Sequence, residues 1–451
     1  MLIIYKFMSC YINTQGGEKM TTMVKFPLKM HIGANCEPIV KLGQLVKRGE
    51  CIAAPNKGLG AKIHTSINGE IKEINENEIV ILKGENQSTD YVKIKECNSI
   101  KEYVFEAGIV GAGGAGFPTH VKLNAEIPEG CIIANCAECE PLLKHNIKLL
   151  EENPQEVIKG IKYAMEATKA PKAYIGIKSK NKDAIESIKK ALVNEENIEI
   201  KELKDIYPMG EERALIHSVL GVWLEPTQLP LEASAVVLNT ETLANIKRAV
   251  EDRKPVIDKD ITIAGKLKDT ESRIFFNVPI GTKIEELVNE CGGIDGEYGE
   301  LVIGGPYTGK SAKLEEAIVT KISGGAIATI EFPEFKGNVG LLVCACGANE
   351  DRLRDIASKM HSNVVSVMDC KNIVKIKGAN KCKTPGDCPG QAAVVMQFKK
   401  DGAERIIISN CSDCSNTVMN SAPKLGLPVY HHTDHVFRTV NHELTRRLDI
   451  E

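Results

Sequence analysis

A glycine-rich loop is the first segment of this sequence that could do chemistry. Gly111, Gly113, Gly114 and Gly116 stand in the run GAGGAG, which satisfies the pattern G-x-G-x-x-G. Glycine has no Cβ atom, so backbone N–H groups in such a loop can approach a phosphate closely, and a helix that starts after the loop favours the negative charge. A dinucleotide-binding fold also needs a strand directly before the loop, but the preceding EYVFEAGIV could be helical. The loop predicts a phosphate contact without fixing the fold.

Two acidic segments follow the glycine loop and could add hydrogen-bond acceptors. In NCAECEP, Glu138 and Glu140 lie on one side of an extended segment, where they could accept hydrogen bonds from ribose hydroxyls or a flavin ring. In YPMGEERALIHS, Glu211 and Glu212 stand where we expect a helix to start. A solvated acidic loop would also explain the first segment, and the preference of acidic residues for a first helical turn would explain the second. Both interpretations stay open.

Cysteines are the third chemical feature. Seven of the 15 cysteines lie between Cys344 and the end of the sequence. At this density, in a chain where we expect no signal peptide, cysteines indicate metal or redox chemistry rather than a disulfide framework. Close pairs suit a redox dithiol or part of a metal site, whereas buried single cysteines can be small hydrophobic residues. The candidate redox or metal residues are Cys344, Cys346, Cys382, Cys388, Cys411 and Cys414.

The composition excludes some classes of function. Of the 451 residues, 43% are hydrophobic and 26% are charged, which is ordinary for a globular protein. The formal net charge of −3 gives no electrostatic reason to bind nucleic acid or an anionic membrane surface. No stretch approaches the roughly 20 apolar residues that cross a bilayer. We therefore expect a cytoplasmic protein that reaches a membrane only through partners.

The chain is long enough for several domains, and its texture changes along its length. We expect an α/β multidomain fold, with translation starting at Met20 or Met23. The predicted segments are residues 1–22 as an untranslated or disordered tail, 23–95 as a barrel-sandwich module of the biotinyl/lipoyl type, 96–250 as a Rossmann-like α/β domain, 251–335 as a β-grasp module and 336–451 as a Cys-rich α/β domain.

Predicted strands place several of the candidate residues. Asn68-Gly69 in HTSINGEIKEI predicts a hairpin turn. In the last segment, the apolar runs VGLLVCAC, NVVSVMDC and ERIIISNC read as strands that each end on a cysteine. Because α/β sheets place their chemistry at the carboxyl ends of parallel strands, we expect these cysteines to converge. His431 and His432 end a fourth predicted strand, LPVYHH, and His435 follows it. We expect these histidines to be surface or packing residues rather than ligands.

Four motifs in a fixed order resemble a known family. GAGGAGFPTHVKL, NCAECEP, YPMGEERAL and VVLNTETLAN resemble the nucleotide-binding domain of the flavoprotein subunit of respiratory complex I. They resemble still more closely the NADH-accepting C subunit of Rnf electron-transfer complexes. That subunit also has a leading barrel-sandwich module and a small ligand-binding β-grasp (SLBB) module, which KPVIDKDITIAGKL to VIGGP resembles. The resemblance covers about residues 25 to 335.

This resemblance implies a flavoprotein with FMN in the glycine loop and NADH stacked over the flavin. No side-chain acid or base is expected for the hydride step. Ala112 and Ala137 stand where complex I usually has Arg and Asp, whereas the Rnf branch tolerates small residues there. The residues that match cofactor contacts are Gly111, Gly113, Gly114, Gly116, Phe117, Lys122, Asn135, Glu138, Glu140, Gly210, Glu211, Glu212 and Asn239.

The last segment departs from the Rnf pattern because it lacks the ferredoxin-type C-x2-C-x2-C-x3-C-P runs. From Met23 to Glu451 the arrangement resembles the electron-transfer proteins associated with D-proline reductase in amino-acid-fermenting anaerobes. This implies transfer of electrons from NADH through FMN and a cysteine-based centre, either a 4Fe-4S-type iron–sulfur cluster or a redox-active dithiol, to D-proline reductase. The alternatives are a component of a membrane ion-translocating complex and a scaffold without cofactors.

Overall fold

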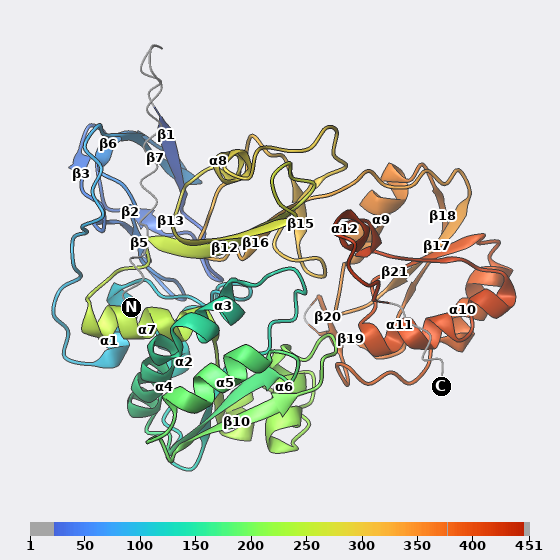
Figure 1. The fold of residues 1–451 in the computed structure, drawn as a ribbon, viewed down its shortest axis with the longest axis horizontal. Helices are drawn as coiled ribbons and strands as arrows, with labels where there is room; N and C mark the ends of the chain where they lie inside the picture. The colour runs from blue at the N-terminus through green and yellow to red at the C-terminus, as the bar shows by residue number, and fades with distance from the viewer. Residues whose placement is uncertain (1–21, 377, 446–451) are drawn as a thin grey trace.

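A computed structural model describes residues 22–376 and 378–445. Four regions follow one another along the chain (Figure 1). We name them the barrel region (β1 to β7), the parallel region (α1 to α7), the mixed-sheet region (β12 to β16) and the tail region (β17 to α12). The predicted tail of residues 1–22 and the predicted start at Met20 lie outside the described residues, apart from Thr22. The alternative start, Met23, is the first residue of β1. No helix in the described ranges is long and apolar enough to cross a membrane.

The barrel region consists of two small antiparallel sheets, β1-β7-β6-β3 and β2-β4-β5. The predicted hairpin at Asn68-Gly69 is wrong, because this dipeptide carries the chain from one sheet to the other. Neither residue has the positive φ that a type I′ turn requires, and the Asn68 side chain instead accepts a hydrogen bond from Arg48 N (2.8 Å). The strands are β1 (Met23–Pro27), β2 (Glu37–Pro38), β3 (Leu45–Val46), β4 (Cys51–Ala54), β5 (Ile63–His64), β6 (Gly69–Ile74) and β7 (Glu78–Lys83).

The parallel region contains a four-stranded parallel sheet of order β10-β9-β8-β11, as its alternating pattern predicts. The helix α4 buries Val157, Ile158 and Ile161 at helical spacing against the core. The segment before the glycine loop is helical rather than a strand, so the usual strand–loop–helix fingerprint is absent from the described residues. The elements are α1 (Ile100–Glu106), α2 (Thr119–Leu123), β8 (Cys131–Cys136), α3 (His145–Glu152), α4 (Pro154–Thr168), β9 (Lys172–Lys178), α5 (Lys182–Ala191), β10 (Ile198–Leu203), α6 (Glu212–Leu220), η1 (Pro230–Ala233), β11 (Ala235–Asn239) and α7 (Thr240–Glu251).

The mixed-sheet region is a five-stranded sheet of order β13-β12-β16-β14-β15, with one helix packed beside it. Pairing is antiparallel except between β12 and β16. Figure 1 shows this sheet next to the barrel region and between that region and the tail region. Its elements are β12 (Asp258–Gly265), β13 (Ser272–Pro279), α8 (Ile284–Asn289), β14 (Leu301–Ile303), β15 (Lys310–Ala312) and β16 (Gly325–Ala328).

The tail region has a second parallel sheet, of order β18-β17-β21-β22. Leu341, Leu342 and Val343 are buried in succession, as expected for a central strand covered on both faces. A hairpin of β19 and β20, which the sequence patterns do not predict, follows β18. The elements are β17 (Asn338–Val343), α9 (Glu350–Lys359), β18 (Asn363–Asp369), β19 (Ile373–Ile376), β20 (Ala379–Cys382), α10 (Ala392–Lys400), β21 (Arg405–Ile408), α11 (Ser412–Met419), η2 (Pro423–Leu425), β22 (Val429–His431) and α12 (Asp434–Thr439).

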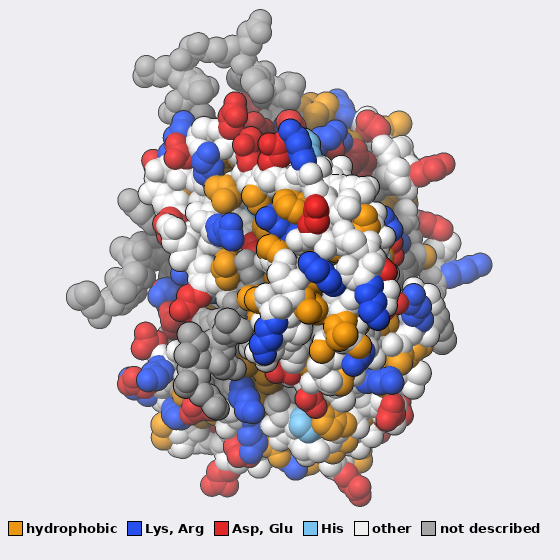
Figure 2. All heavy atoms as spheres, turned by 90° about the vertical axis from the view of Figure 1, so that its right-hand side faces the viewer, with side chains coloured by type: hydrophobic (Ala, Val, Ile, Leu, Met, Phe, Trp, Pro, Cys, Tyr) orange, Lys and Arg blue, Asp and Glu red, His pale blue; other side chains and the backbone are white. Residues whose placement is uncertain are grey.

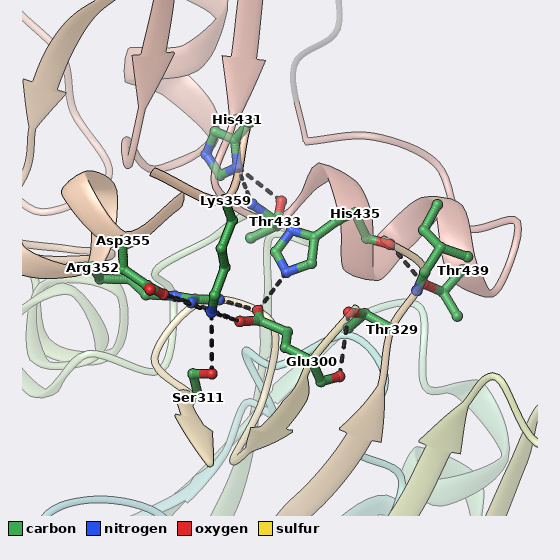
Figure 3. Close-up of polar contacts among 11 residues, drawn as sticks. Glu300, Ser311, Thr329, Arg352, Asp355, Lys359, His431, Thr433, His435 and Thr439 are labelled. Carbon is green, nitrogen blue, oxygen red and sulfur yellow. Dashed lines mark hydrogen bonds and ion pairs between the residues drawn. The ribbon is translucent and has the colours of Figure 1, made fainter. Parts of the chain in front are cut away.

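A buried ion-pair network joins the tail region to the mixed-sheet region (Figure 3). Glu300, directly before β14, is 5% exposed and pairs with Arg352 and Lys359 of α9 at 2.9 and 2.8 Å. Its other oxygen lies 2.7 Å from His435 Nε2. Burial raises the pKa of Glu300, but hydrogen bonds from His435 and Arg352 hold this pKa well below its usual range. The carboxylate is therefore a charged clamp between the two regions.

The outer face of the tail region is mixed in character. In Figure 2, Lys and Arg side chains alternate there with Asp, Glu and hydrophobic side chains. Charge of both signs is therefore spread over this face rather than gathered into one patch.

Candidate functional site

The glycine loop is closed on itself at the surface of the parallel region. Gly111 N donates to Phe117 O at 2.9 Å, and Ala112 N donates to the Thr242 hydroxyl at 3.0 Å. Residues 113–115 at the tip are exposed. A Cβ atom at Gly113 would lie 2.4 Å from Asn239 Nδ2, whereas a Cβ atom at Gly114 would meet nothing within 4 Å. The loop thus presents bare backbone next to the start of α7.

Several other predicted cofactor residues meet beside this loop. Lys122 Nζ donates to Glu212 at 2.6 Å and to the Val237 carbonyl at 3.1 Å. Asn135 Nδ2 donates to the Gly210 carbonyl at 2.8 Å. These contacts join Lys122 of α2 with β8, β11 and the start of α6. The carboxyl edge of a parallel sheet is where such folds place a ligand.

Both helix starts in this area have side-chain caps. Glu211 accepts hydrogen bonds from Arg213 N and Ala214 N, so α6 begins where the sequence predicts. Asn239 accepts from Glu241 N at 2.9 Å and caps α7. The carboxyl edge of the sheet is therefore rigid next to the glycine loop. Its hydrogen-bond donors are the exposed glycine backbone and the ammonium group of Lys122. This donor set fits the phosphate of a flavin mononucleotide.

Glu138 and Glu140 point to a different place from the one expected. Glu138 accepts from Glu140 N and from the Asn146 amide, both at 3.1 Å. Glu140 accepts from Tyr307 N (2.8 Å) and from the backbone and hydroxyl of Thr308 (2.9 and 2.6 Å). Burial raises the pKa of Glu140 to about 7 despite these hydrogen bonds. In this structure Glu140 joins the parallel region to the mixed-sheet region, and both carboxylates line a cavity of about 500 Å³ between these regions.

The candidate cysteines converge at the carboxyl edge of the tail sheet. Cys344 follows β17, and Cys411 is the N-cap of α11 after β21. Cys370 directly follows β18 and is in hydrogen-bonding contact with Cys344 and Cys414. Six of these thiols form a series in which each contacts the next, and Cys411 contacts Cys414 at the side of the series. We call these seven thiols the cysteine row. The order of the series is Cys382, Cys346, Cys344, Cys370, Cys414 and Cys388.

The chemical state of the row differs along its length. Hydrogen bonds from Cys344 and Cys414 hold the pKa of Cys370 well below its usual range. A hydrogen bond from Cys414, helped by Thr417 and Gln391, lowers the pKa of Cys388 to about 6 against the effect of burial. None of the seven thiols of the row forms a disulfide in this structure. Among the described residues no three or more His, Cys, Asp or Glu side chains are arranged to hold a metal ion.

An aromatic pair connects the glycine-loop site to the cysteine row. The rings of Tyr207 and Tyr307 stack with centroids 3.6 Å apart. The Tyr207 hydroxyl donates to the Cys346 carbonyl, and Ser412 N donates to the Tyr207 carbonyl at 3.2 Å. Tyr207 lies in the same YPMGEE segment as Gly210, whose N–H donates to Cys139 Sγ at 2.7 Å. The sequence motifs point to Gly210 in this segment but give no role to Tyr207, Tyr307 or Cys139.

The three histidines of the tail region are packing residues. His431, His432 and His435 are at most 2% exposed, so the surface part of the expectation is wrong. His431 Nε2 contacts the Asn410 carbonyl at 2.8 Å, His432 Nε2 contacts the Tyr307 carbonyl at 3.1 Å, and His435 pairs with Glu300. Each ring thus serves the packing of the tail region or its attachment.

Two known domain families match the sequences of the barrel region and the parallel region. Residues 104–248 match the Nuo51 FMN-binding domain, and residues 16–96 match the RnfC barrel sandwich hybrid domain. These matches confirm the expected barrel-sandwich module and the expected FMN-binding domain.

Curated relatives extend the match. The C subunit of the Na(+)-translocating ferredoxin:NAD(+) oxidoreductase complex of Acetobacterium woodii is 32% identical over 69% of this chain and 74% of its own length. The C subunit of the proton-translocating complex of Clostridium ljungdahlii is 33% identical over 71% of this chain and 70% of its own. The cobalamin reductase PduS of Salmonella typhimurium is 36% identical over 51% of this chain and 49% of its own. The chain therefore belongs to the family of the C subunits of ion-translocating ferredoxin:NAD(+) oxidoreductase complexes, a family of electron-transfer proteins, and carries its FMN-binding domain.

Proposed function

We propose that this protein takes electrons from NADH at an FMN held by the glycine loop and passes them through the cysteine row to a protein acceptor. One observation carries the proposal. Tyr207 lies three residues before Gly210 of the predicted flavin site and donates a hydrogen bond to the Cys346 carbonyl of the cysteine row. The two candidate centres are therefore adjacent through one segment of the chain, without a second protein between them.

The predicted cofactor residues that lie at the glycine loop have defined roles in this proposal. The backbone of Gly111, Gly113, Gly114 and Gly116 admits the phosphate, and Lys122 supplies a positive charge that Glu212 and the Val237 carbonyl hold in place. Phe117 would stack on the nicotinamide nucleotide. Bound FMN supplies hydride acceptance and electron release, while the protein supplies position and electrostatics. Asn135, Gly210, Glu211 and Asn239 keep the edge rigid.

The acceptor that best fits the sequence resemblance is D-proline reductase. The test starts with protein reconstituted with FMN under anaerobic conditions and titrated with NADH. We expect the flavin absorbance to bleach, and to return when D-proline reductase and D-proline are added together. Protein that holds no flavin after reconstitution would favour the cofactor-free scaffold. Flavin that bleaches but does not reoxidise with this reductase would exclude it as the acceptor.

A second candidate function is membership of a membrane ion-translocating complex. The relatives from Acetobacterium woodii and Clostridium ljungdahlii, with 32% and 33% identity, favour it. The tail region, which lacks ferredoxin-type cysteine runs, argues for the first candidate. Purification of the native protein from gently solubilised membranes decides between them. Copurification with integral-membrane proteins of such a complex would support the second candidate, and recovery with a reductase would support the first.

A further inference from the structure

The cysteine row connects the interface with the parallel region to the protein surface. Cys346 and Cys388 are partly exposed, whereas Cys344, Cys370 and Cys414 between them are buried. Cys346 lies at the Tyr207 contact, and Cys388 lies at the opposite end of the row, beside Cys414. The part of the row from Cys346 to Cys388 thus runs from the predicted flavin site, where Cys382 lies beside Cys346, to an outer end that a second molecule can reach.

The outer end is held in a fixed orientation by polar contacts. Cys388 N donates to Asp413 Oδ2 at 2.7 Å, and Cys388 Sγ lies 3.2 Å from the Thr417 hydroxyl. Gly390 N donates to Cys388 Sγ at 3.3 Å. A Cβ atom at Gly390 would meet nothing within 4 Å, so the chain two residues after Cys388 is open to the surroundings. Donors around a partly exposed thiol are typical of reactive cysteines.

A single side chain spans the outer half of the row. Gln391 is fully buried, and its Nε2 lies 3.1 Å from Cys370 Sγ, 3.5 Å from Cys388 Sγ and 4.0 Å from Cys414 Sγ. Its Oε1 has no hydrogen-bond partner among the described residues. One amide therefore faces three sulfur atoms that come from three different segments, and it can donate to whichever of them carries negative charge.

We infer that the cysteine row is a dithiol–disulfide relay in which Cys388 reduces a disulfide on a partner protein and Cys414 is the resolving thiol. The inference rests on the proposed function only for the source of the electrons. The Cys388 thiolate attacks one sulfur of the partner disulfide, whose S–S bond breaks, and the leaving thiolate takes up a proton. The Cys414 thiol then attacks Cys388 with loss of its proton and forms the Cys388–Cys414 disulfide, and the second partner sulfur leaves and takes up that proton.

The same contacts let this disulfide move inward without net oxidation. Attack by Cys370 on Cys414 releases Cys388, attack by Cys344 on Cys370 releases Cys414, and attack by Cys346 on Cys344 releases Cys370. Each exchange replaces one disulfide and one thiol by another disulfide and another thiol. The Cys344–Cys346 disulfide at the Tyr207 contact is reopened by two electrons and two protons, which NADH and one solvent proton supply through the flavin site.

A trapping experiment tests the outer step in the full-length protein. The Cys414→Ser variant is reduced with dithiothreitol, desalted and mixed with glutathione disulfide, and the adducts are mapped by peptide mass spectrometry. We expect a stable glutathione adduct on Cys388 in this variant and only a transient one in the wild-type protein, where Cys414 resolves it. Cys97→Ser, a partly exposed cysteine outside the row, is the matched control and should behave like wild type.

A kinetic measurement tests the relay as a whole. In Cys388→Ser, NADH-dependent reduction of glutathione disulfide should fall about tenfold or more, while anaerobic reduction of the flavin by NADH is unchanged. Brief alkylation of the wild-type protein should modify Cys388 first, which checks the assignment without any substitution. An adduct on another cysteine, an unchanged rate in Cys388→Ser, or iron and sulfide bound by the row in anaerobically purified protein would each overturn the inference. Failure of NADH to reduce the flavin would instead refute the proposed function, because the trapping experiment uses dithiothreitol.

Discussion

The parallel region and the tail region use similar sheets for different kinds of chemistry. Both have four parallel strands and place their candidate residues at the carboxyl edge. In the parallel region this edge carries exposed glycine backbone, Lys122 and capped helix starts, which suit a bound cofactor. In the tail region it carries buried thiols that contact one another. The difference indicates that one edge is built to bind a cofactor, whereas the other carries reactive sulfur atoms of its own.

The largest expected effect follows from breaking the contact that attaches the tail region to the mixed-sheet region. Glu300→Gln removes the carboxylate that pairs with Arg352, Lys359 and His435. The two cations then keep only the partly exposed Asp355 as an acidic partner. Because loss of one partner of a buried pair is strongly destabilising, we expect a loss of about 3–5 kcal/mol in the free energy of unfolding. Urea denaturation measures this. Glu350→Gln removes an exposed pair with Arg354 and should change stability by less than about 1 kcal/mol. Equal effects of the two variants would contradict the assignment of Glu300 as the clamp.

Acid should weaken the same clamp in the wild-type protein. The pKa of Glu300 is well below its usual range in the folded state, because hydrogen bonds from His435 and Arg352 outweigh burial. A Glu in an unfolded chain titrates near about 4.3. Since the folded pKa is the lower one, the stabilisation is fully present above this value and is lost as the pH falls below it. The free energy of unfolding, measured as the pH is lowered through this value, should fall more steeply in the wild-type protein than in Glu300→Gln. Parallel curves for the two proteins would exclude Glu300 as the cause.

The next effect tests the cofactor side of the comparison. In Gly113→Val the new side chain would collide with Asn239, which cannot swing away without losing its cap on Glu241 N. We expect FMN affinity to fall about a hundredfold, which corresponds to about 3 kcal/mol. Flavin content after gel filtration measures it. Gly114→Ala is the matched control, because its Cβ atom meets nothing within 4 Å. Normal flavin content in Gly113→Val would remove the loop from the site.

The two edges also differ in how far the sequence predicts them. The glycine loop, Asn135, Gly210 and Asn239 could be predicted because each lies in a short motif with a local conformation. The convergence of strand-end cysteines could be predicted from the expected parallel sheet. The order of contacts in the cysteine row could not, because Cys382 and Cys388 come from the β19–β20 hairpin and the loop after it, where no periodic pattern predicts the position.

Contacts between regions are the features that the sequence predicts least well. Glu140 is expected at a cofactor, but it binds Tyr307 N and Thr308, which lie more than 160 residues away in sequence. His435 has its partner Glu300 at a separation of 135 residues. No local pattern contains these separations, since they depend on how folded regions dock. The same reason explains why Tyr207, which connects the two candidate centres, has no signal beyond its position in the motif that contains Gly210.

The smallest effect tests the connection itself. Tyr207→Ala removes the ring that stacks on Tyr307 and the hydroxyl that donates to the Cys346 carbonyl. Reduction of the flavin by NADH should be unchanged, because Tyr207 is not among the predicted flavin contacts. The later appearance of thiols in the cysteine row should slow about tenfold. Rapid-quench alkylation counts these thiols after a single addition of NADH. Tyr207→Phe keeps the stacked ring and loses only the hydroxyl, so its rate separates packing of the two regions from the hydrogen bond. If both variants transfer electrons at the wild-type rate, the parallel region and the tail region do not exchange electrons through the Tyr207 contact. The contact would then serve only to pack the two regions together.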